Sequence, residues 1–276
     1  MKEGVLCTVC PRGCLIREGR LGFCGGRANR NGKIVADNYG KVTSIALDPI
    51  EKKPLRRFKP GSWILSVGSY GCNLRCSFCQ NYCISMEKNP VRCLEVTPQQ
   101  LVEKALQLMP DGNIGIAYTY NEPLIGYEFV RDCAELAEKK GLSNVVVTNG
   151  YINEEPLLEI LPLVHAFNID LKSFSPAFYK AIGGDLEVVK NTIRLAAAKS
   201  HVEVTTLIIP GENDSEEEMR ELSSWLASIS PAIPLHISRF FPAYKMSDRG
   251  PTPVSVIIKL AEIAQESLRY VYGGNL

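Results

Sequence analysis

Three cysteines stand close together in the stretch SYGCNLRCSFCQN, residues 69–81. Cys72, Cys76 and Cys79 have CxxxCxxC spacing, and disulfides between such near neighbours would be strained. The spacing therefore indicates a metal site. Three thiolates can hold three irons of a 4Fe-4S cube, whereas electron-transfer clusters ordinarily use four cysteines, so one iron would stay open to another molecule. The alternatives are a structural zinc site and a cluster closed by Cys83, which follows at a further xxx interval.

A second group of cysteines, the N-terminal cysteine set, lies near the start of the chain. It consists of Cys7, Cys10, Cys14 and Cys24. Four thiolates are enough for a closed tetrahedral zinc site or a fully ligated 4Fe-4S cluster, and the spacing does not choose between them. Reduced cysteines packed in a small domain are the third interpretation. The other three, Cys83, Cys93 and Cys133, are expected to be ordinary buried or half-buried thiols.

The composition, with 45% hydrophobic and 22% charged residues in a chain of 276, is typical of a soluble globular protein. Lysine and arginine number 31 against 30 aspartates and glutamates, so no overall field attracts nucleic acid or an anionic membrane. We interpret the basic run KKPLRRFK, residues 52–59, as a solvated linker. The start MKEGVLCTVCPRGC lacks the apolar stretch of a signal peptide, and no apolar run reaches about 18 residues. We therefore expect a cytoplasmic protein, in which cysteines stay reduced, with no nucleic-acid or membrane partner.

Six short apolar runs alternate with amphipathic stretches along the rest of the chain. They are WILSVG, IGIAYT, NVVVTN, AFNIDLK, VEVTTLII and IPLHISRF. Strands that alternate with helices predict a parallel sheet, and helix starts are expected at Thr97, Asn153 and Thr252. A complete eight-unit barrel takes about 250 residues, so six units predict an α/β fold, a partial (βα)6 TIM-like barrel over residues 61–276. A doubly wound open sheet is the alternative. Residues 1–60 are expected to form a small N-terminal Cys-rich, metal-binding domain.

Polar residues follow these runs at the point where each predicted strand ends. In parallel α/β folds the carboxyl ends of the strands lie at one rim, where ligands bind, so we expect these residues to meet the cysteine loop. They belong to the stretches TYNEP, TNG, IDLK, IIPGEND and HISR. His236 points either to this rim or into the barrel wall, and Arg239 and Tyr244 are the expected substrate-facing groups. We expect His165 and His201 to have structural roles.

The stretch CNLRCSFC resembles the CxxxCxΦC signature of the radical S-adenosylmethionine (SAM) superfamily, with Phe78 as the aromatic residue. The resemblance covers nearly the whole chain from Gly61 and implies a partial barrel, a 4Fe-4S cluster, and SAM chelated to the open iron. It also implies an anaerobic oxidoreductase. A low-potential donor of the ferredoxin or flavodoxin type reduces the cluster, SAM is cleaved to a 5′-deoxyadenosyl radical, and the radical abstracts hydrogen from a substrate. No catalytic side chain is assigned beyond the cluster.

The resemblance also implies residues that contact SAM. TYNEP is similar to the glycine-glycine-glutamate-proline element of the family, and the Glu122 carboxylate suits the SAM ammonium group. TNG and IDLK are similar to stretches of pyruvate formate-lyase activating enzymes, which implies that Lys172 pairs with the SAM carboxylate. The alternatives are a helix N-cap role for Glu122 and a surface salt bridge between Asp170 and Lys172. The expected SAM-binding residues are Phe78, Asn121, Glu122, Thr148, Asn149, Asp170, Lys172 and His236.

The substrate is left open by two departures from the activating enzymes. Val147 stands where they carry an aspartate, and Thr205 where they carry an arginine. A protein-glycine activase therefore competes with an enzyme that modifies a small molecule or another protein. An iron-sulfur electron carrier and a zinc scaffold are the alternatives outside the enzyme class.

A closer likeness is to the radical SAM member of the group that accompanies AMMECR-type and Memo-type proteins. It is carried by CTVCPRGC with GFCGG, YGKVTSIALDPIEKKPL, CSFCQN, TYNEP and HISRFFPAY. The likeness implies those two proteins as partners. Members of the group often continue into a further cysteine pair, so we expect that a C-terminal tail is missing.

Overall fold

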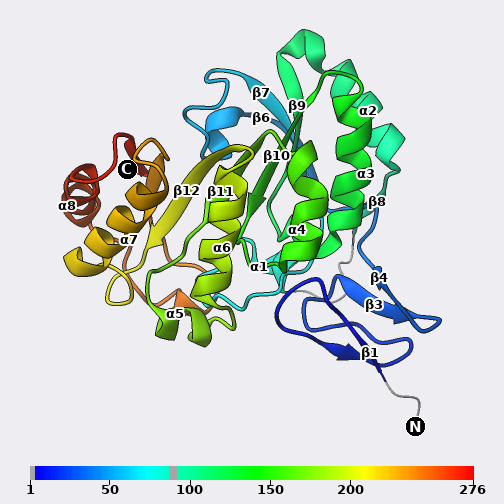
Figure 1. Cartoon of the computed structure of the whole chain (residues 1–276), viewed down its shortest axis with the longest axis horizontal. Coiled ribbons are helices and arrows are strands. Elements are labelled where there is room, and N and C mark those ends of the chain that lie inside the picture. The colour runs from blue at the N-terminus through cyan, green and yellow to red at the C-terminus, as the bar shows by residue number, and fades with distance from the viewer. Residues whose placement is uncertain (1–3, 87–91) are drawn as a thin grey trace.

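An eight-stranded sheet forms the centre of the computed structural model, which describes residues 4–86 and 92–276 (Figure 1). The strand order is β14-β13-β12-β11-β10-β9-β7-β6, and every neighbouring pair from β7 to β14 is parallel. The strands are β6 (Ser44–Pro49), β7 (Trp63–Gly68), β9 (Asn113–Tyr118), β10 (Ser143–Thr148), β11 (Ala166–Asp170), β12 (His201–Ile208), β13 (Leu235–Arg239) and β14 (Val271–Gly274). All six predicted strands are present, so the α/β fold with a mostly parallel sheet is confirmed.

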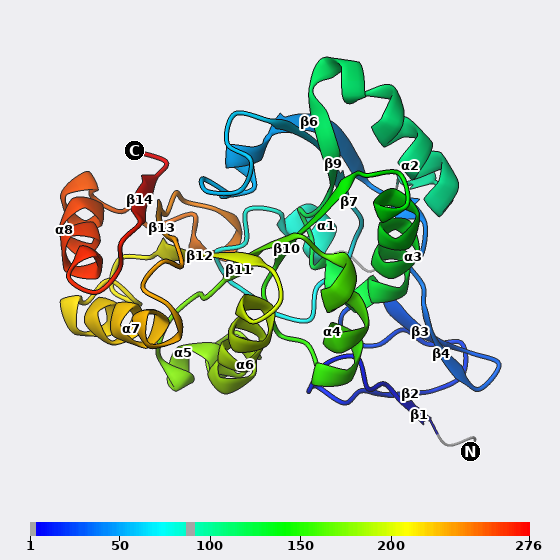
Figure 2. The ribbon, with the colours of Figure 1, turned by 45° about the horizontal axis from the view of Figure 1, so that its top comes forward.

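The six long helices of the described chain cover one face of this sheet, on the outside of the arc of strands (Figure 2). They are α2 (Pro98–Gln107), α3 (Tyr127–Glu138), α4 (Glu154–Ile160), α6 (Leu186–Ala197), α7 (Glu216–Ile229) and α8 (Val254–Gln265), with α1 (Tyr82–Ser85) and α5 (Pro176–Ala181) as shorter helices. Their apolar stripes share the main core with outward-facing strand residues such as Val67, Ile116 and Phe167. A doubly wound sheet would instead carry helices on both faces.

The predicted helix starts are correct at two positions and wrong at the third. The Thr97 hydroxyl accepts the N–H of Gln100, whose side chain accepts the N–H of Thr97, so α2 begins with a capping box. Asn153 precedes the first residue of α4. Thr252 does not cap α8, because that helix begins after Pro253 and the Thr252 hydroxyl donates to the carbonyl of Ile208 instead.

The other face of the sheet is closed toward the amino ends of the strands by the connection between β6 and β7. Ile50 and Leu55 of this connection are fully buried against strand residues such as Ile64 and Ala166. The interpretation of residues 52–59 as a solvated linker is therefore only partly correct: Lys52, Arg56, Arg57 and Lys59 are exposed, whereas Lys53 and Leu55 are buried. Apolar residues within the basic run draw it across the sheet, because burying them stabilises the fold more than exposing the chain to water.

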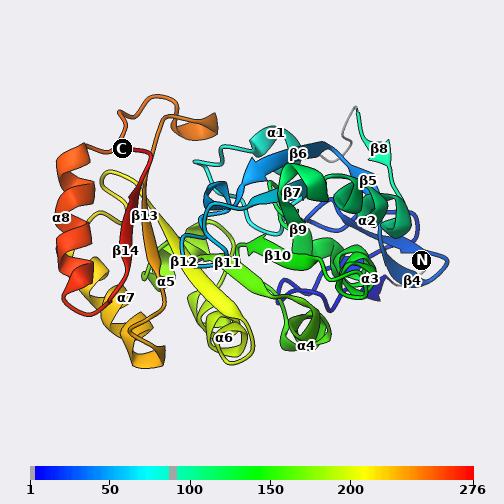
Figure 3. The same ribbon diagram turned by 90° about the horizontal axis from the view of Figure 1, so that it is seen from above.

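Residues 4–43 contain only short strands, and they lie beside the main sheet (Figure 1). These strands are β1 (Val5–Leu6), β2 (Leu15–Ile16), β3 (Arg27–Arg30), β4 (Lys33–Ala36) and β5 (Lys41–Val42), which pairs with β8 (Leu94–Glu95). β6 follows them but belongs to the main sheet, where it pairs antiparallel with β7. β6 and β14 are the two edges of that sheet (Figure 3). The division into domains at residues 60 and 61 stays a prediction.

Among the described residues, none of the helices combines the length and the apolarity that a membrane span requires.

Candidate active site

A cavity of about 350 Å³ opens at the carboxyl ends of the strands, on the face that the long helices leave free. The segment between β7 and α1 enters this region, inside the arc of strands in Figure 2. All three loop cysteines and every expected SAM-binding residue except His236 line the cavity. These residues are Cys72, Cys76, Phe78, Cys79, Asn121, Glu122, Thr148, Asn149, Asp170 and Lys172. The parallel sheet therefore brings together side chains as far apart in sequence as Cys72 and Lys172.

The three loop cysteines form one wall of this cavity. Cys72 Sγ accepts hydrogen bonds from the N–H of Leu74 at 3.4 Å and from Asn149 Nδ2 at 3.6 Å. Burial raises the pKa of Cys72 well above its usual range, and it raises that of Cys76 to about 11 although the charge of Lys172 opposes the change. Such thiols stay protonated at neutral pH until a metal draws the proton away.

The donor set fits a cluster with one iron left free. Within the described residues, these are the only thiols that line the cavity. Cys83 lies on α1 with an exposed side chain, and Cys93 is exposed as well, so the expectation that both are buried or half-buried is wrong; Cys133 is fully buried, as expected. In residues 4–86 and 92–276 no three His, Cys, Asp or Glu side chains form a group that could hold a single metal ion. A cubane cluster binds each thiolate through a different iron.

Glu122 is held by three hydrogen bonds at the bottom of the cavity. Its Oε1 accepts the hydroxyl of Thr148 at 2.7 Å and the N–H of Leu124 at 3.0 Å, and its Oε2 accepts the N–H of Asn149 at 2.7 Å. Burial raises the pKa of Glu122 to about 7, against the effect of these donors. Because two carboxylate oxygens have about four lone-pair sites, one acceptor position stays available to a ligand.

Asp170 and Lys172 line the cavity where β11 ends. Lys172 Nζ and Asp170 Oδ2 are 3.0 Å apart, and the Lys172 side chain is only 17% exposed. Burial disfavours the ammonium form, but the carboxylate of Asp170 outweighs it and raises the pKa of Lys172. Lys172 therefore brings a positive charge close to the thiols, and it forms the ion pair with Asp170 that was the alternative to a SAM contact.

His236 does not reach the cavity, which corrects its assignment as a SAM-binding residue. Its Nε2 lies 2.6 Å from Glu203 Oε2, and its ring packs against Tyr272. On β13 the side chain of Ser238, which lies closer to the carboxyl end of the strand, lines the cavity instead. His236 thus occupies a deeper layer, where the buried Glu203 carboxylate needs hydrogen-bond partners.

The two expected substrate-facing groups are also absent from the described lining of the cavity. Arg239 Nε donates to the carbonyl of Thr252 at 2.6 Å. The ring of Tyr244 stacks on that of Tyr82, with 4.7 Å between the ring centres. Both side chains therefore hold neighbouring loops together.

Lys52 and Lys53 line the cavity although sequence reasoning placed them in a linker, and they lie beside Tyr120 of the expected TYNEP stretch. Lys53 Nζ and the Tyr120 hydroxyl both contact Asp48 Oδ2, at 2.9 and 2.8 Å, and Lys53 and Tyr120 line the cavity together with Lys52. Tyr120 has a φ of +72°, a conformation that is rare outside glycine. The pair of lysines in the basic run was the available signal, but their direction depends on the burial of Ile50 and Leu55 on either side of them.

The N-terminal cysteine set lines a second, small cavity. Its lining consists of Cys7, Val9, Cys10, Arg12, Cys14, Ile16, Gly22, Cys24, Arg27, Asn73 and Ile125. Burial raises the pKa of Cys24 to about 11, although the N–H of Gly26 lowers it. The fold therefore gathers four thiols that are spread over the first 24 residues.

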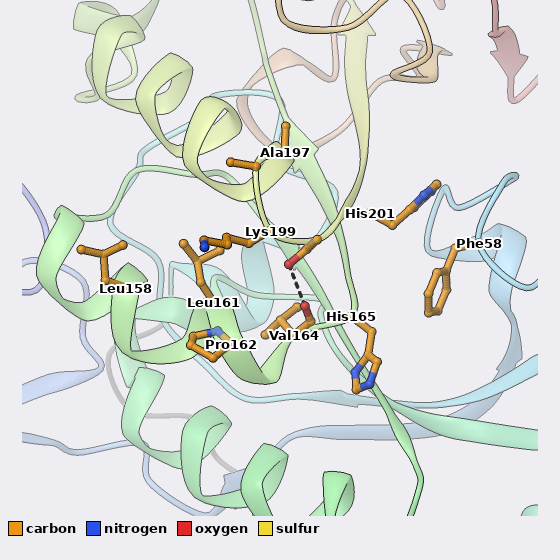
Figure 4. Close-up of a pocket in the computed structure, with 11 residues that line it drawn as sticks. Phe58, Leu158, Leu161, Pro162, Val164, His165, Ala197, Lys199 and His201 are labelled. Carbon is orange, nitrogen blue, oxygen red and sulfur yellow. Dashed lines mark hydrogen bonds between the residues drawn. The ribbon is translucent and has the colours of Figure 1, made fainter.

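A larger cavity, about 610 Å³, lies at the opposite ends of the strands (Figure 4). His165 and His201 are among its lining residues, and a hydrogen bond of 2.8 Å joins Ser200 Oγ to the carbonyl of Val164 there. Both histidines have protein partners, since His165 Nδ1 accepts the N–H of Asn144 and His201 Nε2 contacts Glu203. The described lining has no thiol and no carboxylate, so the smaller cavity is the better candidate for chemistry.

The comparisons with known proteins agree with this assignment. The model of the radical SAM superfamily matches residues 66–223. An uncharacterized protein of Methanocaldococcus jannaschii is 43% identical over 99% of this chain and 81% of its own length. The pyruvate formate-lyase-activating enzyme of Clostridium pasteurianum is 30% identical over 58% of this chain and 67% of its own length.

A radical SAM methyltransferase from Sphaerobacter thermophilus has a similar fold. Its crystal structure matches 78% of this chain and 67% of its own chain, with a TM-score of 0.58 and 19% identity. The family implies a 4Fe-4S cluster and SAM as cofactors, and it supports an enzyme. With the loop cysteines and the strand-end residues around one cavity, and a family model that spans more than half of the sequence, the chain belongs to the radical SAM superfamily.

Proposed function

We propose that this protein uses a 4Fe-4S cluster at Cys72, Cys76 and Cys79 to cleave SAM reductively and abstract hydrogen from a substrate. The observation that carries the proposal is the single cavity shared by three thiols, the Glu122 carboxylate and the Lys172 ammonium group. When bound, such a cluster supplies the electron that converts SAM into methionine and a 5′-deoxyadenosyl radical. A low-potential protein of the ferredoxin or flavodoxin type is the proposed source of that electron.

The side chains of the cavity would bind and orient SAM. Glu122 is fixed by its three hydrogen bonds and would accept the SAM ammonium group at its remaining lone-pair site. Lys172 would pair with the SAM carboxylate, since its charge is already favoured by Asp170. Apolar side chains that line the same cavity, among them Leu74 and Phe78, would exclude water from a reactive intermediate.

We also propose how the chain is divided between a barrel and a smaller domain. The sheet with helices on one face and open edges at β6 and β14 supports a partial (βα)6 barrel. Residues 1–60 would be the Cys-rich domain attached to it, and the reduced thiols suit the cytoplasm.

The proposed reaction class is that of the glycyl-radical-enzyme activases, and a second candidate stands beside it. Val147 and Thr205, where the activases carry an aspartate and an arginine, both line the cavity. The chemistry around SAM therefore differs from that of the activases on the substrate side. This observation favours a small molecule or a protein target other than a glycine. AMMECR-type and Memo-type proteins remain proposed partners.

The test is anaerobic reconstitution with iron, sulfide, dithionite and SAM, followed by assay of 5′-deoxyadenosine. We expect the nucleoside from the wild type and from Cys83→Ala, whose thiol is exposed and outside the cavity. Cys76→Ala should abolish it. An iron-sulfur carrier would bind iron without cleaving SAM, and a zinc scaffold would contain no iron; either result contradicts the proposal.

A further inference from the structure

The N-terminal cysteine set and the cysteine loop are in direct contact through their backbones. The N–H of Cys72 donates to the carbonyl of Cys24 at 3.1 Å. Arg75, between the loop cysteines, donates to the carbonyls of Cys72 and Phe23. A continuous path therefore runs from Cys24 Sγ through its backbone carbonyl to the amide and Sγ of Cys72.

Asn73 forms a second link between the two sites. Its side chain belongs to the lining of the N-terminal cavity. The same side chain accepts a hydrogen bond of 3.0 Å from Asn149 Nδ2, which also contacts Cys72 Sγ. The residue directly after the first loop cysteine thus faces the N-terminal set, so the two thiol groups share a wall.

Two arginines around the N-terminal cavity each have a buried Nε donor without an acceptor among the described residues. Arg27 is only 5% exposed, and its Nη1 is bound to the Glu128 carboxylate at 2.6 Å. Within the described residues, the Nε atoms of Arg27 and Arg12 have no partner, although both side chains line the cavity. Buried donors are almost always satisfied in native proteins. The cavity therefore suits an anionic occupant with several acceptor atoms.

We propose that the N-terminal cysteine set holds a second 4Fe-4S cluster, ligated by all four thiolates, through which an electron enters the protein. Backbone N–H groups already point at Cys10 and Cys24, so a zinc ion with four thiolates would leave only the sulfurs of Cys7 and Cys14 as acceptors for the free donors. A cubane adds inorganic sulfides, which accept hydrogen bonds and so match the free donors of Arg12 and Arg27. The contact between Cys24 and Cys72 gives such a cluster a redox role that zinc lacks.

Electron transfer through the N-terminal cysteine set rests on the proposed function. A reduced ferredoxin or flavodoxin gives up one electron and is oxidised. The cluster at the N-terminal set takes up that electron, changes from the 2+ to the 1+ state, and returns to 2+ when the electron passes on to the centre at the cysteine loop. No proton or bond change is required at the four-thiolate cluster, because all its irons are already ligated.

The test compares three variants of the full chain after anaerobic reconstitution. Cys10→Ala/Cys14→Ala removes two ligands of the N-terminal set, Cys76→Ala removes one from the loop, and Cys83→Ala/Cys93→Ala alters two exposed thiols as the matched control. Iron, acid-labile sulfide and zinc are measured per chain, and electron paramagnetic resonance spectra of reduced samples are recorded with and without SAM.

We expect the N-terminal double variant and Cys76→Ala each to lose half of the iron and sulfide, and the control to lose none. The signal left in the N-terminal double variant should still change on addition of SAM, which also shows that this variant is folded. The signal left in Cys76→Ala should not change. Zinc in the wild type, or full iron content in the N-terminal double variant, would overturn the second cluster. A wild type with two clusters but no response to SAM would contradict only the proposed function.

Electron entry is tested by the visible absorbance of the SAM-responsive cluster during reduction. Dithionite is small and should reduce this cluster in the wild type and in the N-terminal double variant alike. Reduced flavodoxin should reduce it in the wild type, and this reduction should be lost in the N-terminal double variant. Equal reduction of both proteins by flavodoxin would overturn the route through the N-terminal set.

Discussion

The backbone carbonyl of Cys24 accepts a hydrogen bond from the N–H of Cys72, over 3.1 Å. This contact leaves room only for a glycine at position 71, directly before Cys72. Gly71 has a φ of +87°, and a Cβ atom there would stand 2.5 Å from the Cys24 oxygen and 3.2 Å from the N–H nitrogen of Gly26. Two backbone segments thus approach each other where a side chain has no room.

Replacing this glycine should separate the two cysteine segments. We expect Gly71→Ala to lower the free energy of unfolding by about 2 to 4 kcal/mol, from the left-handed backbone and the clash with a backbone oxygen together. The matched control is Gly61→Ala, because Gly61 has a φ of +77° and, among the described residues, no atom beyond its own chain neighbours lies within 4 Å of the position that an alanine methyl group would take there. This control should lose only about 1 kcal/mol of unfolding free energy, which comes from the left-handed backbone alone.

Urea denaturation of the metal-free chains measures both values. Equal losses in the two variants would show that the contact between the cysteine segments contributes nothing to stability.

The strands and the residues at their ends were predictable because both depend on local sequence. Apolar runs such as NVVVTN are buried whichever strands they pair with. A parallel sheet then places the carboxyl end of every strand at the same rim. The cysteine loop, Glu122 and Asp170 therefore meet as expected around one cavity.

Features that depend on distant partners were not predictable. Nothing local to residues 44–49 indicates that they pair with β7 rather than with the short strands before them. Lys53 turns into the site because the apolar residues after it are buried. His236 lies below the cavity because its imidazole forms a hydrogen bond with the buried carboxylate of Glu203 on the neighbouring strand.

Glu203 should make stability depend on pH in acid. Its side chain is fully buried, and burial raises its pKa, but hydrogen bonds from His201, His236 and the N–H groups of Arg56 and Arg57 outweigh this and hold the pKa at about 2, below the usual 4.5. A depressed carboxyl pKa stabilises the fold above the unfolded value, and this stabilisation is lost as the pH falls from 4.5 toward 2. The full contribution is about 3 kcal/mol.

The variant Glu203→Gln removes this titration. Its deficit in unfolding free energy should be largest at neutral pH and should shrink as the pH falls, which urea denaturation between about pH 7 and pH 3 will measure. Glu266→Gln is the control, because Glu266 forms an exposed ion pair with Arg220 and should change stability by less than about 0.5 kcal/mol. A constant deficit at every pH would mean that the Glu203 charge is not what stabilises this layer.

Glu122→Gln should affect both folding and SAM binding. An amide cannot accept all three donors, because its NH₂ group would face the N–H of Leu124 or of Asn149. We expect a loss of about 1 to 3 kcal/mol in unfolding free energy and of about tenfold or more in SAM affinity. Equilibrium dialysis of the reconstituted protein measures the affinity. Glu159→Gln, at the surface beside Arg131, should alter neither quantity, and an unchanged SAM affinity in Glu122→Gln would rule out the ammonium contact.

Lys172→Met distinguishes a SAM contact from a simple ion pair with Asp170. Methionine fills a similar volume but removes the charge, so a ligand carboxylate would lose its partner and SAM affinity should fall about tenfold. Stability should change by only about 1 kcal/mol, since Asp170 is 35% exposed and water can solvate its carboxylate. Lys180→Met, at an exposed position on α5, is the matched control. If Lys172 served only Asp170, stability would fall while SAM affinity in equilibrium dialysis stayed at the wild-type value.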